Sequence, residues 1–72
     1  MFNIEVKYMN ECMRRAKADR QHSIHQQGDT VMQYLNKTYD CGIDAHHVVT
    51  KSGDVFEIKR SYDNNYVTLI AI

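Results

Sequence analysis

The stretch "AHHVVTKSGDVFEIK", residues 45–59, has the pattern of two strands joined by a tight turn. Residues 45–50 are rich in β-branched side chains. After the turn-forming triplet Ser52-Gly53-Asp54, residues 55–59 again contain the apolar side chains typical of a strand. Glycine flanked by small polar residues between two such runs is typical of a β-hairpin. The stretch therefore predicts a β-hairpin.

Two more strands are expected outside this hairpin. Residues 63–65, Asp-Asn-Asn, tolerate a left-handed backbone and predict a second turn, which is followed by a final strand over 66–72. At the other end of the chain, apolar and polar side chains alternate over residues 2–8. This period of two predicts a strand with one face on the core.

The region between these strands has helical spacing. Asn10 and Glu11 suit a helix start near residue 11, because a side-chain oxygen and a negative charge favour the free amides of a first turn. Gly28 leaves two alternatives open: one long helix, or a break with Gly28 as the C′ residue and Asp29 capping a second helix. A second helix would bury Val31, Met32 and Leu35, and Cys41-Gly42 would close the helical region.

These elements predict an α+β fold with the order β-α(-α)-β-β-β. We expect a single, mostly antiparallel sheet with a helical layer on one face. Seventy-two residues suffice for one domain, residues 1–72, since a chain this short buries only about 60–65% of its unfolded surface. One core of this size rarely supplies more than about 3–5 kcal/mol, so association with another chain is a further expectation.

Charge and composition narrow the classes of function. Nine basic and nine acidic side chains cancel, so no long-range field draws the chain to nucleic acid or to an anionic membrane. Residues 1–5 lack the basic and apolar regions of a signal peptide, and no stretch approaches the length of a membrane span. We expect a cytoplasmic protein without a membrane partner, in which Cys12 and Cys41 are reduced.

Reactive residue types gather in "CGIDAHHVV", residues 41–49, but their spacing argues against catalysis. His46 and His47 are adjacent in an expected strand, so they point to opposite faces and do not share one substrate atom or metal ion. A cysteine enzyme based on Cys41 remains an alternative that no oxyanion signature supports. We expect no catalytic residues and no cofactor.

A metal site is also not expected. His22 and His25 lie three residues apart, on one face of the expected helix, and this spacing can chelate a metal ion. Two ligands do not complete a zinc site, however, and no CxxC or HxxxH pattern supplies the others.

A short basic run suggests a second class of partner. Four cations lie within residues 14–20 and would contact phosphates: Arg14, Arg15, Lys17 and Arg20. Glu11 and Asp19 flank them, so the positive patch is narrow. A nucleic-acid-binding regulator is therefore the alternative to our main hypothesis.

The main hypothesis is a protein-binding module. The strand over 66–72 is apolar on both faces, whereas one helical layer covers one face, so we expect a partner or a second copy of the chain to cover the other. The predicted docking residues are two tyrosines and two strand residues: Tyr62, Tyr66, Val67 and Leu69. By analogy, an inhibitor or accessory role fits, as in small proteins with which viruses and mobile elements block host enzymes. The alternative without a partner is that the strand residues are simply tolerated at the surface.

Overall fold

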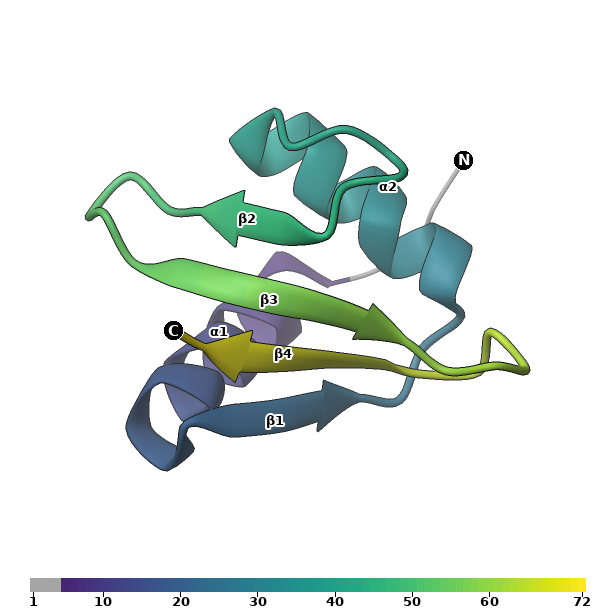
Figure 1. Cartoon of the computed structure of the whole chain (residues 1–72), viewed down its shortest axis with the longest axis horizontal. Coiled ribbons are helices and arrows are strands. Elements are labelled where there is room, and N and C mark those ends of the chain that lie inside the picture. The colour runs from purple at the N-terminus through teal and green to yellow at the C-terminus, as the bar shows by residue number, and fades with distance from the viewer. Residues whose placement is uncertain (1–4) are drawn as a thin grey trace.

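A computed structural model describes residues 5–72 as two helices and a four-stranded sheet (Figure 1). The elements follow in the order α1 (Val6–Asp19), β1 (Gln21–Ile24), α2 (Gly28–Tyr39), β2 (His47–Val49), β3 (Val55–Arg60) and β4 (Val67–Ala71). In space the strands are ordered β1-β4-β3-β2, and each neighbouring pair is antiparallel. The α+β class with one antiparallel sheet is confirmed.

Helix α1 begins earlier than its sequence pattern suggested. Its buried residues Met9, Cys12, Met13 and Ala16 repeat at the three-to-four spacing of a helix face that packs on a core. The strand expected over 2–8 is therefore wrong for residues 6–8, which form the first turn of α1, while residues 2–4 lie outside the described part. The alternating pattern was misleading, because Val6 and Tyr8, two apolar residues that it assigned to the core face of a strand, are both exposed in α1.

The helix expected to continue to residue 27 ends at Asp19. Arg20 adopts a left-handed backbone with φ of 76°, and the chain then reverses into β1. Strand β1 pairs with β4 from Gln21 opposite Ile70 to Ile24 opposite Val67. The alternative of a single long helix is thus wrong. The helical region is interrupted before Asp29, as the other alternative expected, but Gly28 is the first residue of α2 and not a C′ residue.

The hairpin expected from residues 45–59 is present as β2 and β3. The amide of Thr50 donates to the carbonyl of Asp54 at 2.8 Å, and Gly53 has φ of 90° in the turn. Only glycine adopts this backbone at low cost, which explains its place between the strands. The two strands differ in length, because β2 has three residues and β3 has six.

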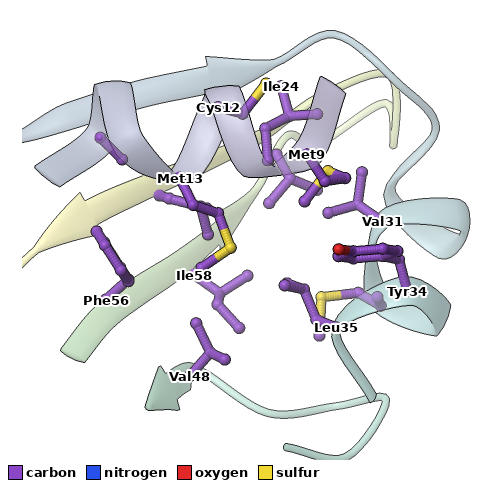
Figure 2. Packing of buried hydrophobic residues seen from close by; sticks show 14 residues of the cluster. Met9, Cys12, Met13, Ile24, Val31, Tyr34, Leu35, Val48, Phe56 and Ile58 are labelled. Atoms are coloured by element: carbon purple, nitrogen blue, oxygen red, sulfur yellow. The ribbon is translucent and has the colours of Figure 1, made fainter. Parts of the chain in front are cut away.

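Both helices pack on the same face of the sheet and form one hydrophobic core with it (Figure 2). Val67 and Leu69 are 0% exposed within this core. The expectation that they face outward is therefore wrong. Since Ile24 is buried and lies opposite Val67, the register fixes the odd-numbered residues of β4 inward, and Thr68 and Ile70 point to the other face.

Candidate protein-binding surface

The outer face of the sheet is not covered by any element within residues 5–72. Residues directly opposite each other on antiparallel strands share a face, so the registers identify the side chains on it. These are Gln21, Ser23, His47, Val49, Val55, Glu57, Lys59, Thr68 and Ile70. At the end where β4 finishes, Val49 lies opposite Val55, and Ile72 bonds to Val55 through its amide. Val49 and Ile72 are 55% and 73% exposed, so this end of the outer face is aliphatic.

The opposite end of the outer face is aromatic. Tyr66 precedes β4 and His25 follows β1, and their ring centroids lie 5.7 Å apart at an interplanar angle of 42°. Tyr66 retains an exposed surface. Between the two ends the face is polar except for Ile70, and the Ser23 and Thr68 hydroxyls are hydrogen-bonded at 2.8 Å.

Beyond this aromatic end, the turn between β3 and β4 holds Tyr62 in solvent. The Ser61 hydroxyl donates to Asp63 Oδ1 and accepts from the amides of Asn65 and Tyr66, all at 2.9–3.0 Å. Asp63 Oδ1 accepts from the Ser61 hydroxyl and also from the Asn65 amide at 3.1 Å, and both bonds favour the ionised carboxylate, so the pKa of Asp63 lies below its usual range, with the Ser61 hydroxyl as the main cause. The turn is thus ordered by its own hydrogen bonds, while the side chain of Tyr62 is fully exposed.

The same turn is fastened to the start of α2. The amide of Gly28 donates to the Asn64 carbonyl at 2.9 Å. Arg60 donates to Asn64 Oδ1 at 2.8 Å and forms an ion pair with Asp29 in the first turn of α2. Figure 1 shows this turn at the right of the molecule, at the end where the chain passes from β1 to α2. Contacts with the first turn of α2 therefore hold the turn that carries Tyr62 in place.

Three of the four cations in the basic run are paired with carboxylates. Arg14 and Arg15 both pair with Glu11, and Lys17 Nζ lies 3.2 Å from Asp54 Oδ2. Arg20 lies outside the helix, because it is the C-cap residue. Glu11 and Asp54 thus reduce the positive charge that these cations would offer to a phosphate backbone.

The cysteines and histidines are dispersed. Cys12 and Cys41 are free thiols, and burial raises the pKa of each, which disfavours the thiolate form that a nucleophile needs. His22 lies in β1 and His25 in the following connection, so the helical spacing expected for them is wrong. Among residues 5–72, no three side chains of His, Cys, Asp or Glu come together as a metal site would require.

Of the four predicted docking residues, the two tyrosines lie at the surface and the two strand residues do not. The outward residues missing from the prediction are Ile70 and Val49, with Val55 beside them. Thr68 could have identified the outer face from the sequence, because a polar residue in the middle of an apolar strand indicates the face that points to water. None of the helices in the described range is long and apolar enough to cross a membrane.

Comparison with models of protein families, with curated proteins and with solved structures finds no match to this chain.

Proposed function

We propose that the chain acts by binding another protein, with Tyr62 as the anchor of the contact. The observation that carries this proposal is the ordered turn of residues 61–66, in which the hydrogen bonds serve the backbone and the Tyr62 side chain is fully exposed. Tyrosine is among the residues that contribute most to protein interfaces, because its ring is apolar and its hydroxyl forms hydrogen bonds.

Rigidity makes this exposed side chain a better anchor. Binding orders loops and side chains, at a cost of about 0.5–1.5 kcal/mol for each immobilised flexible side chain. The turn that carries Tyr62 is already held to α2 through Gly28 and Asn64, so its backbone has little freedom left to lose. The pair formed by Tyr66 and His25 extends the aromatic surface onto the outer sheet face.

The likeness to small inhibitors or accessory proteins remains an analogy, and it supports only the class of partner. The alternative of nucleic-acid binding is less well supported, because three of the four cations in question are paired with carboxylates. A homodimer remains an alternative occupant of the same surface. Sedimentation velocity over a range of protein concentrations separates it from a heterologous partner.

The test compares affinity capture from host extract by three baits: the wild type, Tyr62→Ala and Lys51→Ala. Lys51 is the matched control, because it is exposed in the other hairpin turn of the molecule. We expect a protein that is retained by the wild type and by Lys51→Ala and is lost with Tyr62→Ala. With that protein purified, Tyr62→Ala should weaken binding by about 2 kcal/mol, the size of an interface hot spot.

The stability of the bait must be unchanged for this comparison to be valid. Tyr62→Ala should alter the free energy of unfolding by no more than about 0.5 kcal/mol, since the side chain is fully exposed. Retention of every captured protein by Tyr62→Ala at wild-type strength would contradict the role proposed for this turn.

A further inference from the structure

Strand β3 extends beyond its neighbour β2. Strand β2 pairs with only the first half of β3, from Val49 opposite Val55 to His47 opposite Glu57. One further hydrogen bond joins the Ile58 amide to the His46 carbonyl at 2.7 Å. Beyond it, the chain before β2 turns away from the sheet, with Gly42 at φ of 83° and the Ala45 amide bonded to the Gly42 carbonyl.

The last residue of β3 therefore has backbone groups that face an empty strand position. On β3 the even-numbered residues bond toward β2, as the Ile58 amide does, and the odd-numbered residues bond toward β4, as the Ser61 amide does. By this alternation, the amide and carbonyl of Arg60 point toward the side of β2. Within residues 5–72 no main-chain group bonds to them there.

This strand position is also hollow. A half-open concavity of about 520 Å³ lies beside it, in the size range of 300–1,000 Å³ typical of ligand sites. Two segments line this concavity, which we call the β3 slot: residues 43–46 and residues 57–60. The slot thus combines free main-chain groups of a strand with room for another chain.

The side chains around the β3 slot indicate what chain would fit. Lys59 points to the outer face of the sheet and is exposed, and neither Asp44 nor Glu57, the two carboxylates that also line the slot, forms an ion pair with it. Opposite charges on directly opposed residues stabilise neighbouring strands. Ile43, exposed at 44%, provides an apolar wall on the other side of the slot.

We propose that the β3 slot accepts an extended peptide segment of the partner protein, which pairs with Arg60 as an added strand in line with β2 and places an acidic side chain beside Lys59. Addition of a strand to a free sheet edge is a common mode of peptide recognition, in which main-chain bonds give affinity and side-chain contacts give specificity. The proposal rests on the proposed function only in taking a protein as the partner, since Tyr62 is not part of the slot.

The probe is a phage-displayed library of random linear dodecapeptides, selected against the wild-type protein. Ala45→Trp is the blocking variant, because Ala45 lines the slot and an indole there occupies the space of the added strand. Lys51→Trp is the matched control, which adds the same side chain in the exposed hairpin turn. Urea unfolding of both variants establishes that they fold.

We expect the selected peptides to be rich in acidic and β-branched residues. Their affinity should fall at least tenfold with Ala45→Trp and less than twofold with Lys51→Trp. Binding should also slow hydrogen exchange of the Arg60 amide at least tenfold, because that amide becomes a donor to the peptide. Failure to enrich any peptide, or equal binding to Ala45→Trp, overturns the proposal.

A second variant tests the charge without altering the space. Lys59→Glu should weaken the acidic peptides at least fivefold, and replacement of their conserved acid by lysine should restore binding to this variant. An unchanged affinity with Lys59→Glu overturns the acidic specificity. Tyr62→Ala should leave peptide binding within twofold of the wild type, so failure of the Tyr62 anchor and failure of the slot are distinguished.

Discussion

Substitution of Gly28 tests how firmly the turn that carries Tyr62 is held. A Cβ atom at Gly28 would lie 2.1 Å from Asn64 Oδ1 and 3.1 Å from Arg60 Nε, so Gly28→Ala forces the Asn64 side chain to move. That movement disrupts the hydrogen bond from Arg60 to Asn64 and strains the bond between the Gly28 amide and the Asn64 carbonyl. The close approach explains why a glycine begins α2.

The magnitude follows from the contacts that are lost. The bond from the Gly28 amide contributes about 1 kcal/mol. The bond from Arg60 involves a charged donor but lies at the surface, so it also contributes only about 1 kcal/mol. Alanine is favoured over glycine in a helix by about 0.5–1 kcal/mol, which offsets part of the loss. Gly28→Ala should therefore lower the free energy of unfolding by about 1–1.5 kcal/mol. For a chain of this length, that corresponds to a fall in Tm of about 4–12 °C.

Urea unfolding followed by circular dichroism measures this change, and a double-mutant cycle identifies its cause. Asn64→Gly removes the obstructing side chain and suits the left-handed backbone of this residue, which has φ of 63°. In that background Gly28→Ala should cost nothing or be slightly stabilising. If Gly28→Ala is neutral in the wild type, or equally costly in both backgrounds, the clash with Asn64 is not what selects glycine.

Three further results are expected. Leu69→Ala should lower the free energy of unfolding by about 2–5 kcal/mol through a core cavity, and Ile70→Ala on the outer face by less than about 1 kcal/mol; urea titrations of both variants check which face is inward. The lowered pKa of Asp63 means that its stabilising contribution is present above the unfolded pKa of about 3.9 and is lost as the pH falls through the lower folded value. Asp63→Asn should therefore reduce stability at neutral pH and flatten its decline below about pH 4, and an identical acid limb in both proteins would contradict this. Because the formal net charge of the chain is zero and Arg14, Arg15 and Lys17 are paired with carboxylates, the wild type should show no binding to mixed-sequence DNA or RNA by fluorescence anisotropy at low salt; affinity that falls steeply with added salt would restore the nucleic-acid hypothesis.

The hairpin and the last strand were predictable because their local signals agree with the tertiary structure. Gly53 occupies a turn with positive φ, and the strands on either side of it carry the expected apolar content. The turn before β4 was equally visible, since Asn64 adopts the left-handed backbone for which asparagine is suited. In these segments each residue favours the conformation that the whole fold requires.

Strand β1 was not predictable from its own residues. Its sequence, Gln-His-Ser-Ile, has one buried side chain, Ile24, and no alternating apolar pattern. Pairing with β4 holds it extended, and the preceding helix ends at Arg20 without a glycine to mark the end. Both features depend on contacts with distant parts of the chain, which override the weak local preferences.

The docking surface was half predictable for a similar reason. A strand that is apolar on both faces offers two sets of side chains for the core, and a shift of one residue exchanges them. The inward set is Val67 and Leu69 because Ile24 and Ile58, which lie opposite them, already point to the helices. The exposure of Tyr62 was easier to foresee, since a turn residue between Ser61 and Asp63 has no strand partner to bury it.

The size of the outer sheet face bears on which occupant it can hold. Four strands about 4.8 Å apart, with at most six residues each, present a flat area of roughly 300 Å². A standard interface buries about 800 Å² of accessible surface on each partner, so two copies that met through this face alone would form a small interface. The turn of Tyr62 adjoins the aromatic end of this face, so a partner that also contacts the turn buries more area than the face alone provides. This geometry favours a heterologous protein over face-to-face self-association, and a concentration-independent sedimentation coefficient for the isolated chain is the result it requires.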